Sequence, residues 1–272
     1  MYEKGAWLPP KLVASGPKRE PCWNPVLTKY KDQLLLFYKV GPNPQRWSGA
    51  FLTSNDEGAS WNPPTLLPAG ILGPIKNKPF ITSDGRMLCG SSVESYERWG
   101  CYIETTSDGG QSWSKSAPIN IPDNLYGIIQ PTVVSTGNQG LLLLARTRNS
   151  KAIAKASSND QGITWSQASL TNLPNPNSGI DAINLKGGEI LLVYNDSTKH
   201  RTPLVVAIST DHGETWANVF TLEKEKGEYS YPAVIQKQAG TIVVAFTYKR
   251  KKIKVVTLDV EPLLKAAYHL KN

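Results

Sequence analysis

The side chains of this sequence that could do chemistry are arginines, carboxylates, amides and a tyrosine at the ends of short apolar runs. A guanidinium binds a carboxylate through two parallel hydrogen bonds, and carboxylates and phenols hold or transfer protons. Arg146 ends one apolar run and Arg201 precedes another, so the pair is suited to an acidic ligand. The candidate residues are Asn24, Lys78, Gln130, Arg146, Asp181, Arg201, Glu228 and Tyr229.

A motif of the form (S/T)-x-D-x-G-x-(S/T)-W, called the box below, occurs four times. The framework to which these boxes belong must position the candidate residues. The copies of the box are Ser54–Trp61, Thr106–Trp113, Ser158–Trp165 and Ser209–Trp216. The tryptophans are 52, 52 and 51 residues apart, and a period near 50 indicates a repeat architecture. Asp and Gly favour a tight turn, and Trp adds a large apolar anchor. We therefore expect the repeated aspartates to be structural.

Each repeat also opens with a polar or aromatic residue, usually followed by proline and an apolar run. These openings are Asn24-Pro25, Lys78-Pro79, Gln130-Pro131, Asp181-Ala182 and Tyr231-Pro232. Short strands, regular turns and little helical periodicity predict an all-β fold, a β-propeller of four-stranded blades, with the boxes between the third and fourth strands. Inner strands of a propeller start around one mouth of its channel, so the candidate residues are expected to converge there.

The number of blades follows from counting these units. Five units have the first three strands, and the fifth ends near Leu258 without a box. The segment Gly5–Val13 resembles the end of a degenerate box with an outer strand, so we expect it to complete the fifth of five blades. The alternative is a six-bladed propeller that is shortened at its amino terminus. Residues 1–260 form the predicted propeller domain, and residues 261–272 form a short helical tail.

Composition limits the partners of the chain. The formal charge of +8 over 272 residues favours an anionic partner, but the basic residues do not form the stripe typical of nucleic-acid binding. No apolar stretch is long enough for a membrane span. The amino terminus lacks the apolar core of a signal peptide, so a complete chain would be cytoplasmic. The cysteines and histidines lack metal-site spacing, so neither metal nor cofactor is expected.

The four boxes in register resemble the Asp-box, or BNR, repeats of the sialidase (neuraminidase) superfamily. That resemblance implies a propeller enzyme in which three arginines hold the substrate carboxylate, a glutamate activates a tyrosine nucleophile, and an aspartate is the acid/base. Arg146 resembles the second of these arginines and Arg201 the third. Tyr229-Ser230 resembles the Tyr-Ser pair at the nucleophile.

The sequence also departs from that pattern. Gln130 stands sixteen residues before Arg146, where the superfamily has the activating glutamate, and an amide cannot act as a base. Asn24-Pro25 stands where the first arginine is expected. Longer phrases, such as Gly227–Pro232, resemble a bacterial and plant group of sialidase-like BNR-repeat proteins, whose members usually carry a further amino-terminal blade.

Three functions follow from these features. The first is a sialidase-like exo-glycosidase for an acidic sugar of a glycan. Arg146 and Arg201 would hold the carboxylate, and Tyr229 would attack or stabilise the anomeric centre. Asp181 or Glu228 would carry protons, and the substrate would contact Lys78, Asn24 and Gln130.

The second function is a non-catalytic carbohydrate-binding propeller, which Gln130 favours. The third is a lyase for uronate polysaccharides, with arginines that neutralise the carboxylate. Glu94, Glu97 and Arg98 are expected in a solvated loop.

Overall fold

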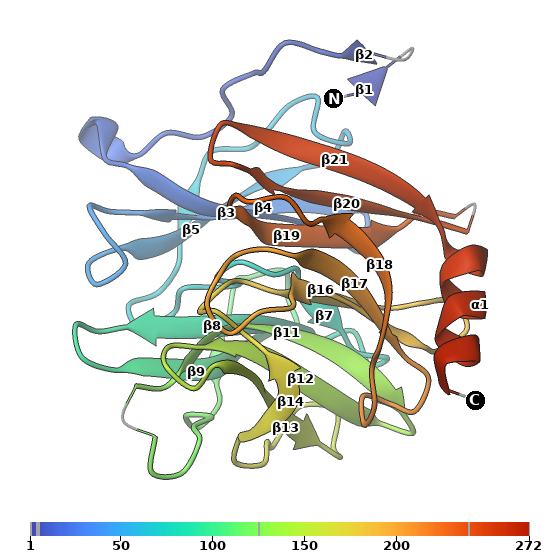
Figure 1. Ribbon diagram of the computed structural model, residues 1–272. Helices are drawn as coiled ribbons and strands as arrows, with labels where there is room; N and C mark the ends of the chain where they lie inside the picture. The colour runs from blue at the N-terminus through green and yellow to red at the C-terminus, as the bar shows by residue number, and fades with distance from the viewer. Residues whose placement is uncertain (1, 4–5, 125, 239, 272) are drawn as a thin grey trace.

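The chain folds as a five-bladed β-propeller (Figure 1). The computed structural model describes residues 2–3, 6–124, 126–238 and 240–271. Four of its sheets have four strands, one has three, and a separate two-stranded sheet lies at the amino terminus. Neighbouring strands within every blade are antiparallel. The all-β, five-bladed prediction is confirmed.

The strands follow one another outward within each blade. Blade 1 consists of β3 (Cys22–Tyr30), β4 (Gln33–Val40), β5 (Ser48–Ser54) and β6 (Thr65–Leu66). Blade 2 consists of β7 (Phe80–Ile81), β8 (Met87–Glu94), β9 (Trp99–Thr106) and β10 (Ser114–Lys115). Blade 3 consists of β11 (Ile128–Gly137), β12 (Gly140–Thr147), β13 (Ala152–Ser158) and β14 (Ser169–Pro174).

The remaining elements complete the chain. Blade 4 consists of β15 (Asp181–Asn184), β16 (Ile190–Asn195), β17 (Leu204–Ser209) and β18 (Ala217–Glu223). Blade 5 consists of β19 (Tyr229–Gln236), β20 (Thr241–Tyr248) and β21 (Lys252–Asp259). Outside the blades are β1 (Tyr2–Glu3), β2 (Ala6–Trp7), the 3-10 helix η1 (Pro17–Arg19) and the helix α1 (Val260–Lys271).

The boxes form the turns after the third strands, as predicted. In blade 3, Asp160 accepts hydrogen bonds from the hydroxyl groups of Ser158 (2.7 Å) and Thr164 (2.6 Å) and from the Thr164 amide (2.9 Å). Gly162 has a left-handed φ of 84°, which a side chain disfavours. The indole of Trp165 donates to the Gly162 carbonyl, so the anchor is tied to its own turn. The box is therefore a self-contained structural unit.

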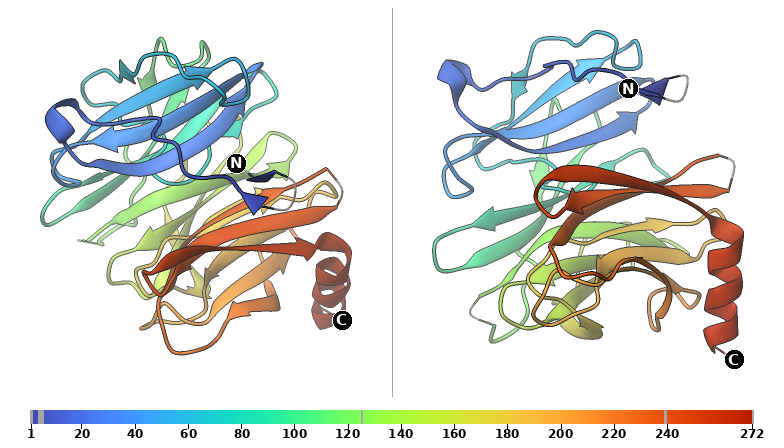
Figure 2. Two further views of the ribbon diagram at one scale, coloured as in Figure 1. Left: turned by 90° about the horizontal axis from the view of Figure 1, so that it is seen from above. Right: turned by 45° about the horizontal axis from the view of Figure 1, so that its top comes forward.

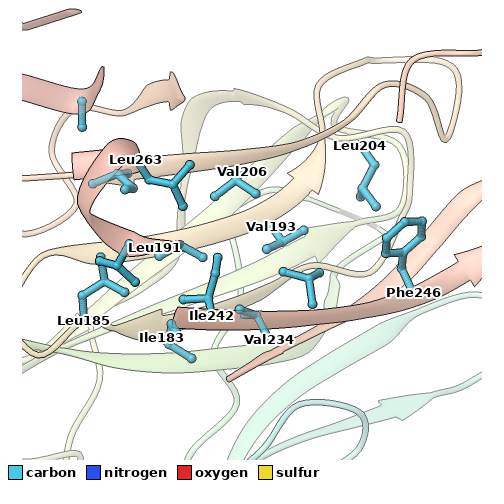
Figure 3. Packing of buried hydrophobic residues seen from close by; sticks show 14 of the residues in the cluster. Ile183, Leu185, Leu191, Val193, Leu204, Val206, Val234, Ile242, Phe246 and Leu263 are labelled. Carbon is cyan, nitrogen blue, oxygen red and sulfur yellow. The ribbon is translucent and has the colours of Figure 1, made fainter. Parts of the chain in front are cut away.

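Apolar side chains from facing sheets join successive blades. Val26 and Phe37 of blade 1 pack with Met87 of blade 2, and similar clusters join blades 2 to 3 and 3 to 4. A larger cluster joins blades 4 and 5 and includes Leu263 of α1 (Figure 3). The helix thus covers the outer part of this core. No helix in the described part of the chain is long and apolar enough to cross a membrane.

The boundary between blade 5 and blade 1 differs from the other boundaries. Among the described residues, no apolar cluster joins these two blades. Ile235 and Ile253, on the face of blade 5 that points away from blade 4, are exposed, and Leu27 of blade 1 is exposed as well. The predicted closure by Gly5–Val13 is wrong for the residues described, because β2 pairs with β1 and not with β21 (Figure 2). Gly5 itself lies outside the described residues.

Candidate functional site

The site begins with the residue that precedes proline in three inner strands. Asn24, Gln130 and Tyr231 have left-handed φ values of 44°, 55° and 52°, which are uncommon for residues other than glycine. Each lies at a β-bulge, where the pairing of the inner strand with its neighbour shifts. A bulge redirects a side chain out of the regular alternation of a strand. These residues are thereby turned away from the faces that pack against neighbouring blades.

Arg146 lies at the end of β12, where its side chain is buried. Its Nη1 donates to Oε1 of Gln130 (3.0 Å), and Nε and Nη2 donate to Oδ1 of Asn177 (3.0 and 2.6 Å). Its Cζ lies 5.6 Å from the centroid of the Trp99 ring. These amides and this ring are neutral, so none of them cancels the charge of Arg146.

Arg201 lies in the segment before β17, on the neighbouring blade. Its Nη1 donates to Oε1 of Glu228 (2.9 Å), and Nη2 donates to the Asn177 carbonyl (3.1 Å). Asn177 thus contacts Arg146 through its side chain and Arg201 through its main chain. The structure brings the two predicted arginines to one place, and the amide that links them was not identified as a site residue from the sequence.

Tyr231 lies beside both arginines. The Arg201 Cζ is 5.3 Å from the centroid of its ring, and 40% of the residue is exposed. Burial of the ring raises the pKa of the Tyr231 phenol, but the charges of Arg146 and Arg201, and hydrogen bonds from both, outweigh that effect. The pKa therefore lies below its ordinary value. Tyr231 is the phenol that a ligand on the two arginines would meet.

Tyr229 does not lie in this site, contrary to expectation. Its side chain is 0% exposed and packs in the core between blades 4 and 5, with its ring 5.3 Å from that of Tyr248. Its hydroxyl is buried and has no hydrogen-bond partner in the described structure. A sugar could reach this hydroxyl only if the core opened. The dipeptide motif that begins the inner strands could have identified Tyr231, because Tyr231-Pro232 matches Asn24-Pro25 and Gln130-Pro131.

Asp181 is a structural carboxylate and not an available proton carrier. It is 2% exposed, and its oxygens accept hydrogen bonds from the Lys78 ammonium (2.7 Å) and from the amides of Val234 (2.8 Å) and Ala182 (3.0 Å). The Thr132 hydroxyl also donates to it. These donors come from blades 2, 3, 4 and 5. Asp181 and Lys78 therefore hold the inner parts of these blades together, which differs from the expected ligand contacts.

Glu228 also has a different role from the one expected. It pairs with Arg201, with Arg250 (2.6 Å) and with the Ser230 hydroxyl (2.9 Å). Partial burial raises the pKa of Glu228. The hydrogen bonds from these three partners together lower it by more than burial raises it, so the pKa lies below its ordinary value. A carboxyl group held in its charged form is a poor acid. Glu228 therefore fixes the position of Arg201.

The pKa of Glu94 is shifted in the opposite direction from that of Glu228. Glu94 ends β8 and pairs with Trp99 across the β8–β9 hairpin. Burial raises the pKa of Glu94, and the charge of Arg146 offsets only part of that increase. The expectation of a solvated loop residue is wrong for Glu94. Its place at the end of a second strand corresponds to that of Arg146 in blade 3, and this correspondence was a usable sequence signal.

Lys76 lies next to Gln130 and Tyr231. Its ammonium donates to the carbonyls of Ile180 (2.8 Å) and Pro232 (2.6 Å) and to Oδ1 of Asn77 (2.7 Å). Burial lowers the pKa of Lys76 to about 7. A methyl group added at Gly179 would lie 3.2 Å from Lys76, 3.3 Å from Tyr231 and 3.4 Å from Gln130, so these side chains meet at one point. Asn24 is half-buried, and in the described structure no hydrogen bond joins it to this group.

The fold and these residues define the class of the protein: an Asp-box propeller in which two arginines and a phenol lie side by side. The family model described as "BNR repeat-like domain" matches residues 1–244. The chain therefore belongs to the BNR repeat-like domain family and is a sialidase-like BNR-repeat protein.

The comparisons with individual proteins agree with this family. A sialidase of Bacteroides fragilis (strain YCH46) is 25% identical over 228 residues. The match covers 74% of this chain and 41% of that protein, so the chain spans about two fifths of this curated relative. A Dyadobacter fermentans protein of unknown function has a TM-score of 0.75 at 20% identity, with 93% of this chain and 79% of that chain covered. The Hadza microbial sialidase Hz136 has a TM-score of 0.76 at 16% identity, with 94% and 57% covered.

Proposed function

We propose that this protein is an exo-acting glycoside hydrolase for an acidic sugar, with terminal sialic acid of a glycan as its substrate class. The observation that carries the proposal is Tyr231, a partly exposed phenol with a lowered pKa beside two arginines. The relatives named as sialidases support the choice of sugar.

The arginines have separate tasks in this proposal. Arg146, whose hydrogen bonds to Gln130 and Asn177 go to neutral amide oxygens, binds the carboxylate most strongly. Arg201 shares its charge with Glu228 and orients the same carboxylate from the other side. Both charges also stabilise the phenolate form of Tyr231. Ionisation of Tyr231 therefore does not depend on a carboxylate at position 130.

The reaction proceeds in two balanced steps. The Tyr231 phenolate oxygen attacks the anomeric carbon as the bond to the leaving oxygen breaks, and protonated Glu94 gives that oxygen its proton. Water then attacks the anomeric carbon of the glycosyl-tyrosine, gives a proton to the Glu94 carboxylate, and releases the sugar and the phenolate. The raised pKa of Glu94 suits it to the first proton transfer.

The test is hydrolysis of 4-methylumbelliferyl N-acetylneuraminide. The native protein is expected to release the fluorophore, and Tyr231→Phe is expected to lose at least about 100-fold in kcat/KM, because the nucleophile is gone. Tyr229→Phe is the matched control. It removes a buried hydroxyl without a partner, so activity should persist and stability should not fall. Loss of activity in Tyr229→Phe alone would contradict this assignment.

Binding without turnover is the second candidate function. It is favoured by the contact of Gln130 with Arg146, where the sialidase resemblance leads us to expect a glutamate. Retention on a sialylated glycan array that depends on Arg146, without release of any sugar, would support it. Release of an unsaturated uronate from a polyuronate would instead indicate a lyase.

A further inference from the structure

The hairpin that joins β20 to β21 (Figure 1) carries a dense positive charge, and no step of the proposed reaction uses it. Four consecutive basic residues, Lys249–Lys252, form its turn and the first position of β21, and Lys254 follows them. All four residues of the run are exposed to solvent. The run and Lys254 together are called the basic hairpin below.

The turn of the basic hairpin holds two of these residues in an uncommon backbone conformation. Lys249 and Arg250 both have a left-handed φ of 52°. The Lys251 amide donates to the Tyr248 carbonyl (3.0 Å), which closes the turn. Two-residue hairpin turns with positive φ at both positions favour Asn-Gly and Gly-Gly, because most side chains disfavour that region. Basic side chains thus stand where local structure favours small residues, and such strain is concentrated at functional sites.

Three ammonium groups of the basic hairpin carry charge that no ion pair offsets. Arg250 pairs with Glu228, and Lys254 pairs with Glu223. Among the residues that the structure describes, the other cations of the hairpin have no carboxylate within ion-pair distance. These cations are Lys249, Lys251 and Lys252. The hairpin therefore keeps a local excess of positive charge.

The ring of Tyr248 gathers these charges into one place. The ammonium groups of Lys249, Lys252 and Lys254 lie 5.5, 5.2 and 5.4 Å from its centroid. An aromatic ring attracts cations electrostatically, so it draws the ends of flexible lysine side chains towards a common centre. Several positive charges are thereby presented together over a small surface.

One carboxylate connects the basic hairpin to the candidate site. Oε1 of Glu228 accepts a hydrogen bond from Arg201 (2.9 Å), and Oε2 accepts one from Nε of Arg250 (2.6 Å). The Lys249 amide donates to the Glu228 carbonyl (2.7 Å). A polymer bound on the hairpin would therefore lie next to the candidate site.

We propose that the basic hairpin is an anion-binding surface for an acidic polysaccharide, whose sulfate or carboxylate groups repeat along the chain. Lysine ammonium groups bind such anions as exposed point charges. A polysaccharide is favoured over a nucleic acid or a lipid surface because the hairpin adjoins a site proposed for an acidic sugar. That choice of polymer rests on the proposed function, whereas binding by the hairpin requires no hydrolysis.

The experiment measures binding of fluorescein-labelled heparin, a sulfated polyuronate, by fluorescence anisotropy. The test variant combines Lys249→Gln, Lys251→Gln and Lys252→Gln. It keeps Arg250 and Lys254, because both form ion pairs. The control variant also loses three exposed lysines, which lie at the β3–β4 and β15–β16 turns. Its substitutions are Lys29→Gln, Lys31→Gln and Lys186→Gln.

Both variants lose the same formal charge, so they differ only in where the lysines are removed. The native protein and the control variant should bind heparin with Kd values within about twofold of each other. The test variant should bind at least about tenfold more weakly, because it lacks the charges nearest to the polymer. Binding should also weaken as NaCl rises from about 50 to about 500 mM, since salt screens exposed charges.

Hyaluronan, which carries carboxylates but no sulfate, identifies the anion that is bound. Binding of both polymers would assign carboxylates as sufficient, and binding of heparin alone would assign sulfate. Absence of heparin binding to the native protein, or an equal loss in both variants, would overturn the proposal. Tighter binding of duplex DNA or of phosphatidylserine vesicles than of heparin would also overturn it.

The heparin measurement needs no turnover. If heparin binds as expected but the aryl sialoside is not hydrolysed, the anion-binding surface stands and the hydrolase proposal fails. If the sialoside is hydrolysed but heparin does not bind, the hydrolase proposal stands and the anion-binding surface fails.

Discussion

At the scale of single residues, the site contrasts two arginines and two carboxyl groups. Arg146 is bound by amide oxygens, whereas Arg201 is bound by the Glu228 carboxylate. Glu228 is kept charged by its arginine partners, whereas burial favours the protonated form of Glu94. Carboxyl groups whose environments move their pKa values in opposite directions divide acid and electrostatic roles between them.

The pH dependence of kcat/KM follows from Glu94 and Tyr231. The active form has protonated Glu94 and ionised Tyr231, with a pKa above 4.5 for Glu94 and below 10 for the phenol. Below the pKa of Glu94, the rate rises with pH because more phenolate is present. Between the two pKa values, the gain in phenolate is cancelled by the loss of protonated Glu94, and above the pKa of Tyr231 the rate falls.

Glu94→Gln separates these two contributions. With an alkyl sialoside, whose leaving oxygen needs a proton, the native protein should show the plateau and Glu94→Gln should lose it. The value of kcat/KM should then rise about tenfold per pH unit up to the pKa of Tyr231. Steady-state kinetics from pH 4 to pH 9 would measure this. An unchanged plateau in Glu94→Gln would mean that another group is the acid.

At the scale of elements, what could be predicted depended on whether a feature is local and repeated. The boxes and the strand openings are local, and both were predicted from the sequence. Tyr229 was chosen over Tyr231 from the resemblance to the Tyr-Ser pair of the sialidase superfamily, and in a regular strand residues 229 and 231 would point to the same side. The bulge between Ser230 and Ala233 separates them, and strand register and bulges are set by pairing with β20.

The box of blade 3 supplies the prediction at this scale. Asp160→Ala should lower the free energy of unfolding by about 1–2 kcal/mol at pH 7, because it removes several hydrogen bonds of the turn. The hydrogen bond from the Thr164 hydroxyl is the largest cause that lowers the pKa of Asp160, to about 2. The stabilisation is therefore complete above the unfolded pKa of 3.8 and lost as the pH falls through about 2.

Urea denaturation at several pH values would test this. The difference between native protein and variant should shrink from pH 4 towards pH 2. Asp32→Ala, at an exposed turn between β3 and β4, is the control. A constant difference over this pH range would mean that the charge of Asp160 is not what stabilises the turn.

At the scale of the whole molecule, five blades were predictable from the period, but the partner of the last strand was not. Closure depends on pairing between the two ends of the chain, for which no local pattern exists. In the described structure, the face of blade 5 that points away from blade 4 is exposed to solvent at Ile253, of which 74% is exposed. The opposite face of the same blade holds Ile242 in the core shared with blade 4.

Ile253→Lys should therefore change the free energy of unfolding by less than about 0.5 kcal/mol, as surface substitutions usually do. Ile242→Lys, the matched variant on the buried face, should prevent stable folding, because it buries an unpaired charge. Thermal unfolding followed by circular dichroism would compare them. A large loss of stability in Ile253→Lys would show that this face is covered in solution.

The central claim is that one acidic sugar is held jointly by Arg146, Arg201 and the residue at position 231. A crystal structure of Tyr231→Phe soaked with 4-methylumbelliferyl N-acetylneuraminide tests it most directly. We expect the sugar carboxylate within hydrogen-bond distance of both guanidinium groups, with the anomeric carbon facing Phe at position 231. A sugar bound elsewhere, or bound with its carboxylate turned away from both arginines, would contradict the account.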